Sequence, residues 1–203
     1  NEHVSSIAGD YTPPGGWFAG VGALVTLDGY RWDDFVPSGY VCDLYMRGGM
    51  LFGPAERRWL ARLDCLGALP LTSGLVLTMR LGSGLRNAGN PNSHIYLGSR
   101  EVRGIDDGVY WNGHAVYLNL ELRQKIFVWN RFGLQLAAFS DGAVFRPMHS
   151  RGDLAGDEQA VSVGGGIRIV PTFLTQIVAR FDAGMLLYPI ERSFIQFGFA
   201  QFF

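Results

Sequence analysis

No run of apolar residues in this sequence is long enough to form a transmembrane helix. Such a helix needs about 20 consecutive, predominantly apolar residues, and the runs here are far shorter although 48% of the chain is hydrophobic. Charged residues are also scarce, at 17% against about 25% in an average soluble domain. The formal net charge of −1 gives no indication of a nucleic-acid partner. A chain of 203 residues fits one domain, which we expect over residues 1–203.

Lysine and cysteine are almost absent. Lys125 is the only lysine, so arginine supplies the other basic side chains. A guanidinium holds several carboxylates in a fixed geometry, which suits a buried polar interior, although a skewed genomic base composition explains this bias equally well. The two cysteines, Cys42 and Cys65, are too few for a scaffold built on disulfides.

Glycine and aromatic residues are abundant, with 28 glycines and 13% aromatics. Apolar and polar residues also alternate with a period of two, which separates them onto the two faces of a β-strand but scatters them around a helix. The clearest case is Ala115–Arg123, where leucines at 118, 120 and 122 alternate with Asn119, Glu121 and Arg123. This pattern predicts strands and not helices.

Nine segments predict strands, at about 17–30, 39–52, 57–69, 73–85, 112–127, 131–145, 160–171, 173–187 and 193–203. Many reach 12 residues, which exceeds the five or six usual in soluble proteins and suffices for a tilted transmembrane strand of about 9–11 residues. Short joins at 69–73, 129–130 and 171–172 contrast with long loops at 86–111 and 146–159. Aromatic residues stand near segment ends, where membrane-interface girdles belong: Trp17, Tyr30, Tyr40, Trp59, Trp111, Trp129 and Tyr188.

Together these features predict an all-β fold, an antiparallel transmembrane β-barrel, over the alternative of a soluble β-sandwich. Bacterial single-chain barrels have even strand numbers, so we expect about ten strands, with His3–Tyr11 as the tenth, or eight if one segment is a loop. The long loops are expected outside the cell. Cys42 and Cys65 flank the Gly53-Pro54 turn at similar distances; this allows cross-strand proximity, but we interpret them as two separate lipid-facing thiols.

The second half of the chain carries a series of motifs in a fixed order. They are Val102-Arg103-Gly104, Asn119-Leu120-Glu121-Leu122-Arg123, Phe139-Ser140-Asp141-Gly142, Gly164-Gly165-Gly166-Ile167-Arg168-Ile169 and the ending Phe197-Gly198-Phe199-Ala200-Gln201-Phe202-Phe203. By these motifs the chain resembles the BamA-type superfamily of outer-membrane assembly factors and two-partner secretion transporters, with its bacterial surface antigen barrel domain. Ala143 stands where the third motif usually ends in Gly, and Ile105 where Tyr or Phe is usual.

The resemblance implies that the long extracellular loop folds into the barrel lumen. Arg103 of the loop motif Val102-Arg103-Gly104 is then expected to pair with Asp141 on the wall, because an unpaired charge in a narrow lumen is costly and a bidentate carboxylate compensates it. Gly104 lets the backbone turn tightly beside it. The predicted luminal charge network is Arg62, Asp64, Arg80, Glu121, Arg123, Arg168, Arg180 and Asp182, with Asp43, Arg47 and Arg58 as further inward residues.

The chain end matches the aromatic signal that the barrel assembly machinery reads, through Gln196, Gly198 and Phe203. We therefore expect an integral protein of the bacterial outer membrane with a periplasmic C-terminus. Its expected partners are outer-membrane lipid, the assembly machinery during biogenesis and the protein partners of a complex. No cofactor or metal is expected.

The length leaves no room for the sixteen strands and POTRA domains usual in this superfamily. We therefore expect a structural or accessory barrel subunit and not an enzyme. Alternatives are a protein insertion or translocation factor, a lipid-modifying enzyme and a passive pore. The side chains available for lipid chemistry are His94 beside Ser93, His114, and His149 beside Ser150, but neither a hydrolase motif nor metal-ligand spacing accompanies them.

Overall fold

The computed structural model describes residues 17–33, 35–52, 56–87, 95–105, 110–147, 157–171 and 178–200, and every regular element in these ranges is a β-strand. The described residues contain no helix that is long and apolar enough to cross a membrane. The strands are β1 (Trp17–Asp28), β2 (Arg31–Asp33), β3 (Val36–Phe52), β4 (Glu56–Pro70), β5 (Leu75–Arg86), β6 (Ile95–Leu97), β7 (Tyr110–Trp129), β8 (Phe132–Pro147), β9 (Glu158–Pro171), β10 (Val178–Tyr188) and β11 (Arg192–Ala200).

The long strands form one antiparallel meander in the order β1-β3-β4-β5-β7-β8-β9-β10-β11, while β2 pairs with β3 and β6 with β7. Each of the nine predicted segments corresponds to one of these long strands. The short strands β2 and β6 were not predicted, because three residues are too few to show a period. The tenth strand expected at His3–Tyr11 lies outside the described residues.

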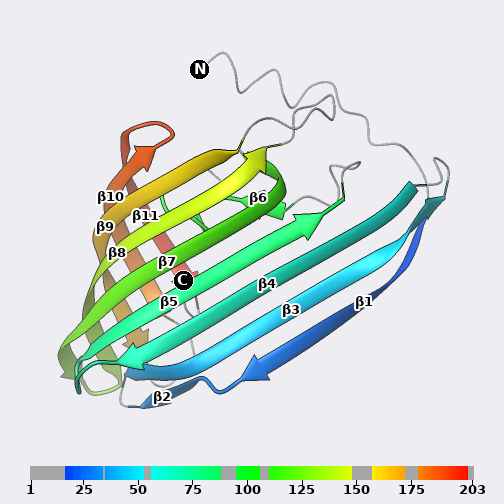
Figure 1. The fold of residues 1–203 in the computed structure, drawn as a ribbon. Coiled ribbons are helices and arrows are strands. Elements are labelled where there is room, and N and C mark those ends of the chain that lie inside the picture. Colours follow the sequence, from blue (N-terminus) through cyan, green and yellow to red (C-terminus); the bar gives the residue numbers. More distant parts are fainter. Residues whose placement is uncertain are drawn as a thin grey trace.

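The sheet curls strongly but stays open. Figure 1 shows β1 to β5 crossing the front of the molecule while β9, β10 and β11 turn away behind them. The path of paired strands ends at β1 on one side and β11 on the other, so the described residues do not form the closed barrel that we expected. In a meander of antiparallel pairs, the first and ninth strands run the same way, so β1 and β11 could not pair with each other as antiparallel neighbours.

Alternation places the charged residues on the concave face and the apolar residues on the convex face. On β7, Asn119 and Glu121 are buried, whereas Leu118 and Leu120 are exposed. The register carries this division across the sheet, since Leu120 pairs with Met79 and Ser140 while Glu121 pairs with Thr78 and Phe139. Opposite positions of neighbouring strands share a face, so one face is polar and the other apolar.

The connections follow the predicted division between the two ends of the sheet only in part, because the end with the long loops also has three-residue connections from β3 to β4 and from β10 to β11. Turns of a few residues follow β4 and β7, whereas longer intervals separate β5 from β7 and β8 from β9. In the β7–β8 turn Asn130 has a φ of 52°, which Asn adopts more readily than most residues. At the same end Phe35, in the connection between β1 and β3, reaches across the interior: its carbonyl accepts a hydrogen bond of 2.6 Å from Gln135 Nε2 on β8.

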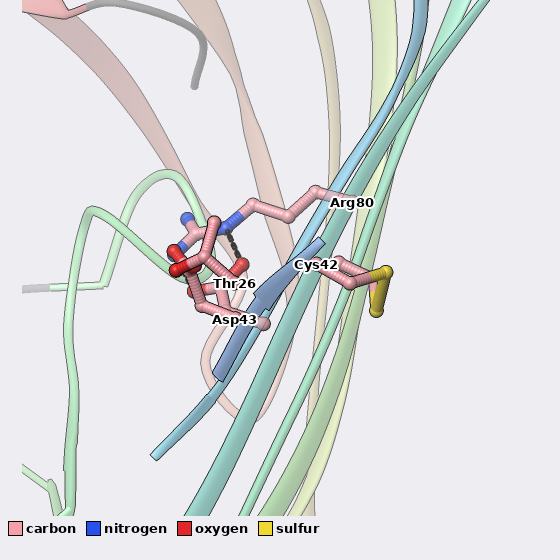
Figure 2. Close-up of a disulfide and its surroundings, with 6 residues drawn as sticks. Thr26, Cys42, Asp43 and Arg80 are labelled. Carbon is pink, nitrogen blue, oxygen red and sulfur yellow. Dashed lines mark hydrogen bonds and ion pairs between the residues drawn. A yellow bond between two sulfur atoms is a disulfide. The ribbon is translucent and has the colours of Figure 1, made fainter. Parts of the chain in front are cut away.

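Cys42 and Cys65 form a disulfide, which corrects our interpretation of two separate thiols. They face each other directly in the β3–β4 register, with 4.1 Å between their Cα atoms. Equal distance from the turn aligned them because the hairpin has no register shift. Figure 2 shows the disulfide of Cys42 on one side of the strands and the polar side chains of Thr26, Asp43 and Arg80 on the other.

Candidate functional site: buried ion pairs beneath an inward-folded loop

Residues 97–105, called the inner loop below, fold onto the concave face of the sheet. The N–H groups of Glu101 and Val102 both donate to the Gly98 carbonyl at 3.0 Å, and the Gly98 N–H donates to Glu101 Oε2 at 3.1 Å. The loop buries Leu97, Val102 and Ile105 in a cluster with Ala115, Tyr117, Ala143, Phe145, Ala160 and Leu186. This apolar contact holds the loop against β7 to β10.

Arg103 forms the predicted pair with Asp141. Its Nε and Nη2 atoms donate to the two carboxylate oxygens, each at 2.7 Å, and its backbone N–H donates to Oδ2 at 3.1 Å. The Arg103 guanidinium also lies 3.6 Å from the centroid of the Phe139 ring. Arg103 and Asp141 are only 2% and 1% exposed, so both charges depend on each other, and the bidentate geometry compensates their desolvation.

Glu121 connects Arg103 to the rest of the wall. Its Oε2 accepts from Arg103 Nη1 at 2.6 Å and from Arg168 Nη2 at 2.7 Å. Its Oε1 accepts from Arg123 Nε at 2.6 Å and from Arg168 Nε at 2.9 Å. Arg168 Nη1 then donates to Asp182 Oδ1 at 2.6 Å. A single carboxylate therefore joins three arginines from the loop, β7 and β9.

Arg180 is the outlying member of this network. Its Nε lies 4.0 Å from Asp182 Oδ2, at the limit of an ion pair. Five of the eight predicted network residues thus gather around Arg103 and Asp141: Glu121, Arg123, Arg168, Arg180 and Asp182.

The other three predicted network residues form a second cluster on β4 and β5. Arg80 donates from Nε and Nη2 to the two oxygens of Asp64, at 2.9 and 2.6 Å. The Tyr117 hydroxyl donates to Asp64 Oδ2 at 2.8 Å, and Arg62 Nη2 reaches the same oxygen at 3.4 Å. Arg80 Nη1 also donates to the Arg100 carbonyl at 3.0 Å. Through this contact with the Arg100 carbonyl, the second cluster binds the inner loop on the side of β4 and β5.

Gly104 ties the loop to the far edge of the sheet. Its φ of +88° is in the region that favours glycine, and a Cβ at this position would run into the Phe194 ring. Its carbonyl accepts from Arg192 Nε at 3.0 Å and also from Arg192 Nη2. The tight turn predicted at Gly104 is confirmed, and it brings the loop against β11.

Several residues at the site were not predicted. Tyr117 and Asn119 lie on the inward face of β7, so the alternation that identified Glu121 could have identified them; Asn119 Nδ2 donates to the Glu101 carbonyl at 2.7 Å. Phe139 shares the inward face of β8 with Asp141, so the same alternation applies to it. Glu101 and Arg192 lie outside the predicted strands and carry no such signal. Their roles depend on where the loop lies, which no local pattern specifies.

Other predicted residues lie away from this network. Asp43, on the concave face of β3, is exposed and accepts a 2.6 Å hydrogen bond from the Thr26 hydroxyl. Gln196 and Gly198 lie on the inward face of β11, opposite Asp182 and Arg180. Phe203 lies outside the described residues.

The histidines considered for lipid chemistry are only partly described. Ser93, His94, His149 and Ser150 lie outside the described residues. His114 Nε2 lies 3.5 Å from Asp157 Oδ1, which also accepts from Arg146 Nε at 2.8 Å. The hydrogen bond from Arg146 lowers the pKa of the exposed Asp157 carboxyl. Within the described ranges no group of three His, Cys, Asp or Glu side chains is placed to hold a metal ion.

The arrangement joins the inner loop to the wall of the sheet through buried ion pairs. In comparisons with known proteins, no protein-family model, no curated protein and no solved structure matches this chain.

Proposed function

We propose that this chain is the wall of an integral outer-membrane β-barrel and serves as a structural or accessory subunit of an outer-membrane complex. One observation carries the proposal: where the inner loop covers it, the sheet buries charged side chains on its concave face and exposes apolar side chains on its convex face. On β7, Asn119 and Glu121 are 2% and 1% exposed, whereas Leu118 and Leu120 are 39% and 37% exposed. Water favours the opposite arrangement, because Glu and Arg are almost never fully buried unless paired and large exposed apolar patches mark interaction surfaces.

The apolar face has the height and the borders of a membrane band. On β3 the outward positions run from Tyr40 to Phe52, about 40 Å along the strand at about 3.3 Å per residue. A tilt of about 45° reduces this to about 28 Å, close to the hydrocarbon thickness. Exposed aromatic residues stand at both ends of the sheet: Trp17, Trp59 and Tyr188 at one end and Tyr40 and Trp129 at the other. These positions suit the two interface girdles.

The disulfide supports a location outside the cytosol. Stable disulfides form in oxidising compartments such as the bacterial periplasm, and both cysteines of this chain are engaged in one. An outer-membrane protein passes through that compartment. The disulfide and the apolar convex face therefore both support a location in the outer membrane.

Barrel closure is part of the proposal. Lipid offers no hydrogen bonds to a free strand edge, so a sheet in a membrane closes. Because β1 and β11 run in the same direction, antiparallel closure takes an odd number of further strands. The tenth strand expected from the sequence, at residues outside the described part, would meet this requirement.

The filled interior favours a structural barrel over a passive pore. The inner loop and two ion-pair clusters occupy the concave face of β4 to β10. We also propose kinship with the assembly-factor superfamily. The Arg103–Asp141 pair supports it, since the loop arginine and the wall aspartate stand in the relation that the sequence motifs imply.

Membrane insertion is tested by placing a charge on the convex face at two depths. Leu120→Arg lies at the middle of β7, whereas Gln124→Arg lies on the same face near the short-turn end. In phospholipid bilayers we expect the first variant to lose about 2–4 kcal/mol of unfolding free energy and the second about 1 kcal/mol or less. Urea unfolding followed by tryptophan fluorescence measures both. Equal losses at the two depths would argue against a bilayer around this face.

A further inference from the structure

We infer that the Cys42–Cys65 disulfide forms before the sheet enters the membrane, in water, by exchange with a dithiol–disulfide oxidoreductase. The inference rests on the proposed membrane location and adds an order of events to it. Oxidation comes first and insertion second.

The position of the disulfide carries the argument. Both cysteines lie on the convex face, directly opposite each other on β3 and β4. Leu27 of β1 stands opposite Cys42, and Leu81 of β5 stands opposite Cys65. Both leucines are exposed on this face. The next convex positions along β3 and β4 are Leu44 and Leu63 toward the middle of the sheet, and Tyr40 and Gly67 toward its end. The sulfur atoms therefore lie beside four leucines, one convex position inside the border of the apolar band.

Disulfide exchange does not proceed well in such surroundings. The Cys42 thiol must lose its proton, and its thiolate must attack one sulfur of the oxidant, forming a mixed disulfide and releasing an oxidant thiolate that takes up a proton. The Cys65 thiolate then attacks the Cys42 sulfur and releases the second oxidant sulfur as a thiol. Two protein thiols are oxidised and one oxidant disulfide is reduced. Each step needs a charged thiolate, which hydrocarbon strongly disfavours, and a polar oxidant, which hydrocarbon excludes.

The same two thiols meet easily before insertion. They are 23 residues apart in sequence and belong to one hairpin, so the loop that brings them together is short. The β3–β4 register alone places their Cα atoms 4.1 Å apart. Nothing from β7 to β11 is needed, and an unpaired β3–β4 hairpin in water exposes both sulfurs to an oxidant.

The test compares oxidation of the reduced chain in two environments. Reduced protein is placed in phosphatidylcholine nanodiscs, which are open to water on both sides, or kept unfolded in urea at the same pH. Oxidised glutathione is added, and the remaining thiols are counted by maleimide gel shift. We expect oxidation in nanodiscs to be at least about a hundredfold slower, because the thiolate there loses its hydration. A reduced chain that enters nanodiscs only after oxidation would support the same order.

Two controls separate this inference from the proposed function. A variant with Cys42→Ala, Cys65→Ala and Thr72→Cys carries its single thiol in the exposed β4–β5 turn and should react with glutathione equally fast in both environments. Quenching of tryptophan fluorescence by brominated acyl chains reports insertion independently. One contrary result is protein that is quenched in nanodiscs and yet oxidises its Cys42 and Cys65 thiols as fast there as in urea. That result would overturn the proposal that oxidation precedes insertion, while the proposed membrane insertion would stand. Protein that shows no quenching even after its disulfide has formed would overturn both proposals.

Discussion

The concave face of the sheet is covered over its C-terminal half and bare over its N-terminal edge. Where the inner loop meets the sheet, the side chains of Arg103 from the loop and of Glu121, Asp141 and Arg168 from the strands are at most 3% exposed. On the same face of β1 and β3, Thr26 and Asp43 are exposed, although the β1–β3 register runs without a shift over both strands. Regular strand pairing is therefore not what buries a charge in this protein. The loop that lies across the strands does so.

The two regions also differ in how their charges are satisfied. Asp141 accepts three hydrogen bonds from Arg103 alone, and Glu121 accepts four from three arginines. Asp43 accepts one from a hydroxyl. Buried charge demands several partners, whereas water serves an exposed carboxylate. On the opposite, convex face of the same strands, the Cys42–Cys65 disulfide joins β3 to β4.

The comparison is tested most severely by neutralising one aspartate in each region. Asp141→Asn removes the carboxylate that binds Arg103 in bidentate geometry and leaves Glu121 as its nearest charged partner, so we expect a loss of about 3–5 kcal/mol of unfolding free energy. Asp43→Asn is the matched control, and its loss should stay below about 1 kcal/mol because the residue is exposed. Urea unfolding in lipid nanodiscs measures both variants. Similar losses of unfolding free energy in the two variants would mean that the inner loop does not make the charges beneath it more important for stability than the exposed Asp43.

Removing the disulfide should weaken mainly the bare region. The bond closes a loop of 23 residues in sequence separation, for which chain entropy gives a stabilisation of about 3 kcal/mol. In the Cys42→Ala, Cys65→Ala double variant, we expect faster amide hydrogen exchange in β1 to β4 and little change in β7 to β10. Mass spectrometry of peptides from each region measures this. Uniform acceleration across the sheet would contradict the division into two regions.

A smaller effect is expected at the glycine that lets the loop reach β11. Gly104→Ala places a Cβ against the Phe194 ring at a positive φ, so we expect a loss of about 2 kcal/mol. Gly67→Ala, on β4, meets nothing within 4 Å and should change stability by no more than about 0.5 kcal/mol. Chemical unfolding of the two variants gives the answer. A neutral Gly104→Ala would show that the loop position tolerates change.

Much of this architecture is visible in local pattern. A period of two identifies a strand without knowledge of the strands beside it, so all nine long strands could be predicted. The same period predicted that Leu120 and Glu121 lie on opposite faces of the sheet. The pairing of Arg103 with Asp141 came from motif resemblance, because the residues are 38 positions apart and no period relates them. Arg192 carried no signal, since it binds a loop carbonyl that only the fold brings near.

The sequence by itself determined where the strands run and which residues each strand turns to either face, because side-chain direction in a strand depends only on parity. The tertiary structure decided three further matters. It aligned Cys42 with Cys65 through the hairpin register, it laid the inner loop over one half of the concave face, and it left β1 and β11 parallel and apart. Each depends on contacts between distant segments, whose alignment the local alternation does not encode.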